Sequence, residues 1–187
     1  PLDMRGALLY ANLLYNNDKY YNRLYWVFPD GHFKTYDKHH LFSLAHEENT
    51  YTAGHKQLII DYKDWKIKPL ICYDLRFPVW CRNTQEADLM LFVANWPERR
   101  VEAWSTLLKA RAIENLCYVL GINRVGADGN NIHHSGHSAL YNCVGEVVSA
   151  SKPHTEEVIK TSLFKNHINE TRNRFGFLND RDFFTIL

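Results

Sequence analysis

A cysteine whose position suits chemistry is the first notable feature of this sequence. Cys72 follows an apolar run that ends in Ile71 and precedes the turn-like stretch Asp74–Pro78. A strand that ends in a sharp turn presents its last side chain at the edge of the sheet, which suits a nucleophile. The thiolate is the attacking form, so such a site needs a base or a positive charge near the sulfur. The alternative is a small buried thiol without reactivity, which is common for a free cysteine.

Two charged residues elsewhere in the chain have the chemistry that a cysteine nucleophile requires. Lys38 follows a predicted strand, and an ammonium there would stabilise both a thiolate and the oxyanion of a tetrahedral intermediate. Glu47, in the polar stretch 46–54, would orient that lysine or assist proton transfer. The backbone N–H of Tyr73 is expected to point toward the same oxyanion. Taken alone, each charged residue is more often a solvated surface residue.

The elements predicted from the sequence must position these residues. Residues 19–27 and 32–36 read as a strand hairpin around Phe28–Gly31, and residues 43–55 read as a polar loop. The continuous apolar run 88–94 predicts a strand that is buried on both faces. The other predicted elements are strands over 57–62, 66–72, 118–123 and 156–163, a hairpin over 138–150, helices over 97–116 and 165–174, and no element over 175–187.

The alternation of buried strands with a strong helix favours a layered α/β domain. The helix has one apolar face, because its large apolar residues recur at three- and four-residue steps. The length of 187 residues suits one domain with a substantial core.

Composition and charge exclude several classes of function. The net charge of +1 and the absence of a long basic run disfavour nucleic acid and anionic membranes as partners. No apolar run is long enough to cross a bilayer, and the first residues lack the layout of a secretory signal. The four cysteines form no CxxC pair, which indicates reduced thiols, so we expect a cytoplasmic protein.

A metal site is the alternative that the ten histidines raise. His133, His134 and His137 are close in sequence, but they lie in a loop of small polar residues, and no HExxH motif occurs. We therefore predict neither a metal nor a cofactor.

The order of these motifs resembles the nitrilase, or carbon–nitrogen hydrolase, superfamily over nearly the whole chain. Within it, the pattern is most similar to the ω-amidase group, which hydrolyses the side-chain amide of 2-oxo acid amides. Besides Lys38 and Glu47, the matching motifs are ICYDLRFP at 71–78, ANWP at 94–97, LLKARAIEN at 107–115, GINRVGADG at 121–129, SGHSALYNCVGEV at 135–147 and RFGFLNDRDFF at 174–184.

The resemblance implies a fold, an activity and an assembly. The fold is the α/β, nitrilase-like four-layer αββα sandwich, formed here by a single domain over residues 1–187. The activity is hydrolysis of a small-molecule amide such as 2-oxoglutaramate through a cysteine thioester, with release of ammonia and without a cofactor. The assembly is a homo-oligomer.

The resemblance also implies roles for individual residues. Cys72 matches the nucleophile, and Lys38 with the Tyr73 N–H matches the oxyanion hole. Glu47 matches the glutamate that supports the lysine, unless a shift of one residue in the loop gives that place to Glu48. The residues expected to bind substrate are Asn95, Trp96 and Arg76, of which Arg76 would meet a substrate carboxylate or form a structural salt bridge.

The family pattern includes a first catalytic glutamate, the general base, in a segment before the lysine. None of the acidic residues before Lys38 lies in that motif; they are Asp3, Asp18, Asp30 and Asp37. We therefore expect a sandwich that is incomplete at its N-terminus and lacks this base. Three interpretations remain open: a fragment of a longer enzyme, a truncated inactive relative that acts as a partner or scaffold subunit, or replacement of the base by another group.

Overall fold

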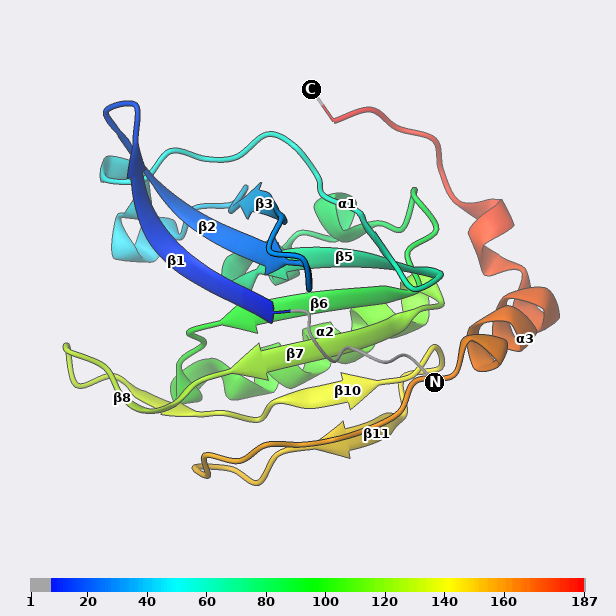
Figure 1. The fold of residues 1–187 in the computed structure, drawn as a ribbon. Coiled ribbons are helices and arrows are strands. Elements are labelled where there is room, and N and C mark those ends of the chain that lie inside the picture. The colour runs from blue at the N-terminus through cyan, green and yellow to red at the C-terminus, as the bar shows by residue number, and fades with distance from the viewer. Residues whose placement is uncertain (1–7, 187) are drawn as a thin grey trace.

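The computed structural model describes residues 8–186 and, within the first strand, the backbone alone for residues 8–12. Its strands form two main sheets (Figure 1). The smaller sheet is antiparallel and has the order β1-β2-β3, with β1 at Leu8–Asn16, β2 at Lys19–Val27 and β3 at Phe33–Asp37. Asp3, one of the acidic residues considered above, lies outside the described residues.

The larger sheet has six strands in the order β11-β10-β7-β6-β5-β4. Its three central strands, β5, β6 and β7, are parallel, while β4, β10 and β11 are antiparallel to their neighbours. The strands are β4 (Ile60–Tyr62), β5 (Trp65–Ile71), β6 (Leu89–Ala94), β7 (Tyr118–Asn123), β10 (Ala139–Tyr141) and β11 (Val147–Ala150).

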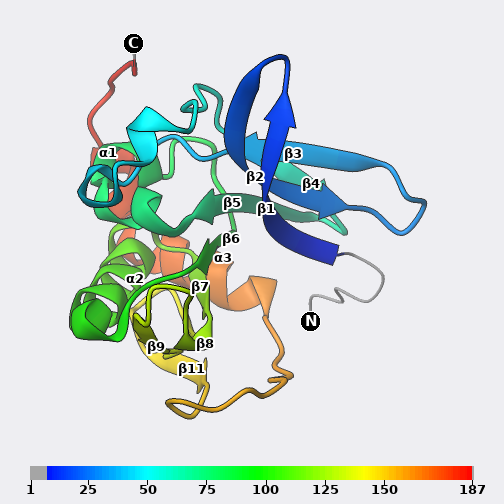
Figure 2. The same cartoon turned by 90° about the vertical axis from the view of Figure 1, so that its left-hand side faces the viewer.

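Helix α2 (Val101–Asn115) covers one face of the large sheet, and the small sheet packs on the other side (Figure 2). The alternation of side chains along β6 explains both contacts. Met90 and Phe92 share a core with Trp104 and Leu108 of α2. The neighbouring Leu89 and Leu91 share a second core with Trp26 of β2. The prediction of a strand buried on both faces is therefore confirmed.

Three layers of the expected αββα sandwich are thus described: α2, the large sheet and the small sheet. Within residues 8–186, no helix covers the outer face of the small sheet (Figure 2). The remaining helices are α1 (Pro78–Cys81), which follows the turn after β5, and α3 (Lys165–Phe175) near the C-terminal end. No helix in this part of the chain is long and apolar enough to cross a membrane.

Several predicted elements differ from the structure. The strand predicted over 156–163 is wrong, because these residues form no regular structure and are mostly exposed. Although their residue types favour a strand, the segment pairs with no strand of the described sheets. Two features were not predicted, β1 and the small hairpin of β8 (Val125–Ala127) with β9 (His133–Ser135). The predicted helix 97–116 is α2 preceded by a short 3-10 turn, Glu98–Arg100.

The parallel strands determine where the site lies. Because β5, β6 and β7 run the same way, their C-terminal ends meet at one edge of the sheet. Cys72 follows β5, Asn95 follows β6 and Arg124 follows β7. This edge is on the left of Figure 1 and faces the viewer in Figure 2.

Candidate active site

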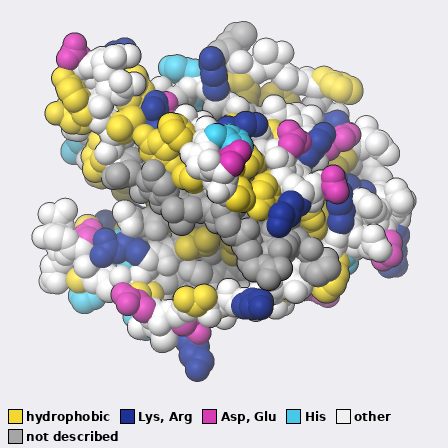
Figure 3. Space-filling model, viewed as in Figure 1, with side chains coloured by type: hydrophobic (Ala, Val, Ile, Leu, Met, Phe, Trp, Pro, Cys, Tyr) yellow, Lys and Arg dark blue, Asp and Glu magenta, His cyan; other side chains and the backbone are white. Residues whose placement is uncertain are grey.

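A cavity of about 980 Å³ lies at this edge of the large sheet. Figure 3 shows the surface hollowed there, between the β1–β2 hairpin and the β8–β9 hairpin. The structure brings together all seven site residues predicted from the sequence, and they line this one cavity: Lys38, Glu47, Cys72, Tyr73, Arg76, Asn95 and Trp96.

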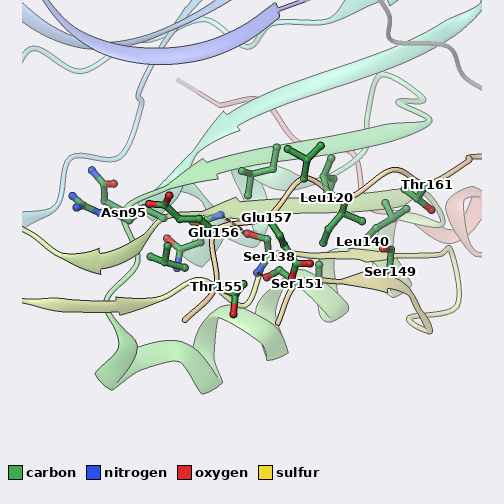
Figure 4. Close-up of a pocket in the computed structure, with 17 residues that line it drawn as sticks. Asn95, Leu120, Ser138, Leu140, Ser149, Ser151, Thr155, Glu156, Glu157 and Thr161 are labelled. Atoms are coloured by element: carbon green, nitrogen blue, oxygen red, sulfur yellow. Dashed lines mark hydrogen bonds between the residues drawn. The ribbon is translucent and has the colours of Figure 1, made fainter. Parts of the chain in front are cut away.

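A second hollow, of about 790 Å³, adjoins the first. It extends along β7 and β10 under the segment 155–161 (Figure 4). The first cavity opens sideways into this groove, because four residues line both: Asn95, Ile122, Asn123 and Arg124.

Cys72 is the first residue of a tight 3-10 turn, Cys72–Arg76, and its backbone is left-handed, with φ of 43°. A non-glycine residue in this region costs about 1–3 kcal/mol and persists only where its surroundings impose it. The buried carboxylate of Asp74 is the group that holds the turn. Its Oδ2 accepts hydrogen bonds from the Ile71 N–H (3.1 Å) and the Tyr36 hydroxyl (2.7 Å).

Asp74 also ties this turn to the segment that carries the lysine. Its Oδ1 accepts a hydrogen bond from the His40 backbone N–H at 2.9 Å, two residues after Lys38. The same carboxylate therefore sets the position of both Cys72 and the loop after β3. Sequence reasoning missed this residue, although an acid two positions after a candidate nucleophile, in an otherwise apolar setting, is a usable signal.

As a residue, Cys72 differs from the other three cysteines in exposure. Cys72 is partly exposed, whereas Cys81, Cys117 and Cys143 are buried. Burial raises the pKa of all four thiols, and it raises the pKa of Cys81 and Cys143 to about 12. At Cys72, the ammonium of Lys38 and a hydrogen bond from the Asn95 backbone oppose the effect of burial on the pKa. The charge of Lys38 thus favours the reactive thiolate.

Lys38 is held by Glu47 in a nearly buried ion pair. The Nζ–Oε2 distance is 2.6 Å, and the side chains of Lys38 and Glu47 are 2% and 20% exposed. The Phe42 N–H donates to the same carboxylate oxygen at 2.9 Å, which fixes its position. Glu48 instead faces His46 at 3.8 Å, so Glu47 is the partner of Lys38.

The backbone N–H of Tyr73 belongs to the first residues of the turn that Cys72 begins, and such N–H groups have no partner within the turn. The Tyr73 ring packs edge-on against Phe42 and Phe77, at centroid distances of 4.9 and 5.1 Å. These contacts fix the residue whose N–H is the candidate oxyanion donor.

Trp96 forms a rigid wall of the cavity. Its backbone N–H donates to Asn123 Oδ1, and its indole N–H donates to the Arg100 carbonyl, both at 2.7 Å. The guanidinium of Arg76 lies over the indole ring, 5.0 Å from its centroid. In the described part of the chain Arg76 forms no ion pair, so the alternative of a structural salt bridge is not found there.

The acidic residues before Lys38 lie elsewhere. Asp37 pairs with Arg23 at 2.6 Å, Asp30 contacts His32, and Asp18 accepts a hydrogen bond from Tyr15. The carboxylates that line the cavity, among residues 8–186, are Glu47 and Asp128.

One buried histidine in the cavity wall was not predicted as a site residue. His134 of β9 is 3% exposed, and its Nδ1 has no hydrogen-bond partner. It belongs to the histidine cluster considered above for metal binding. In the part of the chain that is described, no three His, Cys, Asp or Glu side chains gather as metal ligands.

Comparisons with known proteins identify relatives of this chain. The family model described as "Carbon-nitrogen hydrolase" matches residues 5–173. The chain is 45% identical over 166 residues to "Omega-amidase YafV" from Yersinia enterocolitica, covering 89% of this chain and 65% of the relative. It is 34% identical over 167 residues to a "2-oxoglutaramate amidase" from Bacillus subtilis, covering 88% of this chain and 64% of that relative. The chain thus spans just under two thirds of the length of these curated relatives.

Solved structures show the same fold. A CN-hydrolase superfamily protein from Xanthomonas campestris, with an arsenic adduct in its active site, superposes with a TM-score of 0.94 at 43% identity. That match covers 96% of this chain and 71% of the other. Nit3 from Saccharomyces cerevisiae, a nitrilase superfamily member, gives a TM-score of 0.79 at 27% identity, covering 89% of this chain and 62% of Nit3.

Proposed function

The chain belongs to the carbon–nitrogen hydrolase family, and on that premise we propose that it hydrolyses the amide of a small 2-oxo acid amide such as 2-oxoglutaramate. The observation that carries the proposal is the convergence of Cys72, Lys38 and Glu47 on one cavity. The names of the relatives, omega-amidase and 2-oxoglutaramate amidase, support the substrate class. They also favour hydrolysis over the alternative of an inactive partner or scaffold subunit.

The reaction proceeds through a thioester. The sulfur of Cys72 attacks the amide carbon, and the carbonyl oxygen becomes an oxyanion held by the Lys38 ammonium and the Tyr73 N–H. The C–N bond then breaks while the nitrogen takes up a proton, so ammonia leaves and an acyl group remains on the sulfur. Water attacks the thioester, which releases the acid and restores the thiol.

Glu47 serves this sequence by holding Lys38. An ammonium in a nearly buried site needs a counter-charge, and the carboxylate supplies it at 2.6 Å. The Phe42 N–H donates to the same carboxylate oxygen at 2.9 Å and helps to hold it beside Lys38. Lys38 therefore keeps its charge directed at the thiolate and, later, at the oxyanion.

The proton that leaves the Cys72 thiol needs a base. Glu47 is already engaged by Lys38 and Phe42, and the other described carboxylate in the cavity wall is Asp128. That a further glutamate acts as the general base stays a prediction from the family resemblance. A proton shuttle of this kind contributes about 10²–10⁴-fold to rate.

The cavity also has groups suited to the rest of the substrate. Asn95 and Trp96 line it beside Cys72, and the guanidinium of Arg76 faces the same space from the ring of Trp96. We assign substrate binding to these three residues. A single domain over residues 1–187, a homo-oligomeric assembly and a cytoplasmic location remain part of the proposal.

Ammonia release from 2-oxoglutaramate tests the proposal. It is measured for this chain and for a form extended at its N-terminus by whatever coding sequence precedes it, each with Cys72→Ala and Cys143→Ala variants. Turnover that is lost in Cys72→Ala and kept in Cys143→Ala supports the mechanism. Turnover in the extended form alone supports the interpretation that the base lies outside this chain. Folded proteins that release no ammonia in either form favour the scaffold alternative.

A further inference from the structure

Positive charge gathers in the cavity that holds Cys72. Among the described residues that line it, five are lysine or arginine and two are carboxylates, although the whole chain has a net charge of only +1. One carboxylate, Glu47, is already paired with Lys38. The other cationic residues are Arg76, Arg99, Arg100 and Arg124. A cavity with this balance favours an anionic ligand.

Two of these arginines rest on aromatic rings. The guanidinium of Arg76 lies 5.0 Å from the centroid of Trp96, and that of Arg100 lies 5.2 Å from the centroid of Phe42. Stacking of this kind orients the planar group and leaves its N–H edge available for a carboxylate. Among residues 8–186, neither Arg76 nor Arg100 forms an ion pair with a carboxylate.

The two ring platforms are connected through Arg100 itself. Its carbonyl accepts the hydrogen bond of the Trp96 indole, so it fixes the ring that supports Arg76. Its guanidinium lies on Phe42, whose N–H holds Glu47. The two guanidinium groups therefore have fixed positions in the same cavity as the catalytic ion pair.

The guanidinium of Arg100 lies near two other positive charges, those of Arg99 and Arg76. Partial burial lowers the pKa of Arg100, and repulsion from Arg99 and Arg76 lowers this pKa further. The negative charge of a Cys72 thiolate acts in the opposite direction on the same pKa. A bound carboxylate would relieve the repulsion between these arginines while lying close to the nucleophile.

We propose that Arg100 acts together with Arg76 as a receptor for the substrate carboxylate, so that the site selects anionic amides over neutral ones. This inference rests on the proposed function, because it assigns the acid group of a 2-oxo acid amide to these two residues. Arg100 is the new element, since the sequence pattern gave it no role in binding. It is a specificity residue, and the bond-breaking steps remain with Cys72 and Lys38.

Competing alkylation of Cys72 tests the receptor without requiring turnover. Iodoacetate carries a carboxylate and iodoacetamide a neutral amide, and with either reagent the thiolate sulfur forms a C–S bond as iodide leaves. The rate constant of each reagent at Cys72 is measured by peptide mass spectrometry on the full chain. The ratio of the two rate constants is independent of the thiolate fraction, because both reagents use the same thiolate.

We expect the ratio of the iodoacetate rate constant to the iodoacetamide rate constant at Cys72 to be at least about tenfold above the same ratio for the free thiol of glutathione. The reason is that hydrogen bonds to charged groups are the strong ones. Arg100→Gln lowers the ratio about tenfold, and Arg100→Lys lowers it less, because the charge stays while the planar fork is lost. Arg174→Gln is the matched control: Arg174 also rests on a phenylalanine, 5.2 Å from the centroid of Phe175, but lies outside the cavity.

Protection of Cys81, Cys117 and Cys143 in the same digests reports that each variant is folded. An unchanged ratio in Arg100→Gln overturns the receptor, and so does an equal fall in Arg174→Gln, which would indicate a general effect of net charge. Either result leaves the proposed hydrolysis to be judged by ammonia release, so the two proposals fail separately.

Discussion

The ion pair between Lys38 and Glu47 is the interaction whose removal we expect to have the clearest effect on stability. The lysine side chain is 2% exposed and its carboxylate partner 20% exposed, with 2.6 Å between the charged atoms. Glu47→Gln keeps the size of the side chain and an oxygen for the Phe42 N–H, but removes the charge. The buried ammonium is then left without a counter-charge.

The size of the effect follows from this geometry. At 2.6 Å and an effective dielectric constant of about 20, the attraction is about 6 kcal/mol. The cost of burying both charges offsets much of that value, and removing one partner of a buried pair costs about 3–5 kcal/mol. Because Glu47 is one fifth exposed, we place the loss for Glu47→Gln near the lower limit, at about 3 kcal/mol.

Urea unfolding followed by tryptophan fluorescence measures this loss. With a denaturant slope of about 2 kcal/mol per molar, the unfolding midpoint falls by about 1.5 M. Glu48→Gln is the control, because Glu48 is exposed and faces His46 at 3.8 Å. Equal shifts in the two variants, or a shift below about 0.3 M in Glu47→Gln, would refute the assignment of Glu47 as the partner that stabilises Lys38.

Two further predictions concern reactivity and the approach of two backbone segments. Because the pKa of Cys72 is raised, the rate of its alkylation by iodoacetamide should still increase with pH above 8. Lys38→Met should slow this alkylation about tenfold at pH 8, since loss of the ammonium raises the pKa of Cys72 further. An unchanged rate in Lys38→Met would contradict the role of the lysine charge. Gly54→Ala should destabilise the fold by more than about 2 kcal/mol, because the new Cβ would clash with the carbonyl oxygen of Asp37, beside Lys38. Gly129→Ala is its control, having open space around the added Cβ, and equal melting temperatures for the two variants would contradict the prediction.

The sequence was sufficient to predict seven of the residues that line the cavity, because each follows a largely apolar strand or lies in a recognisable motif. Strands β6 and β7 are mostly apolar and β5 ends in an apolar run, and the parallel pairing of the three strands places their ends together. Cys72, Asn95 and Trp96 lie at these ends for that reason.

The features that sequence reasoning missed depend on contacts between distant segments. β1 is defined by its pairing with β2, and its mixed polar and apolar residues indicate no clear period. The orientation of Arg100 depends on Phe42, which belongs to the loop after β3. The strand predicted over 156–163 fails for the converse reason: its residue types suit a sheet, but the segment pairs with no strand of the described sheets.

The central claim is that Cys72 attacks an amide and carries the acyl group as a thioester. Acid quenching of the protein during incubation with 2-oxoglutaramate, followed by peptide mass spectrometry, tests it directly. We expect an acyl adduct on the peptide that contains Cys72, sensitive to hydroxylamine, and none on the peptides of Cys81, Cys117 and Cys143. Consumption of the amide without that adduct, or its absence from both this chain and the N-terminally extended form, would contradict the account.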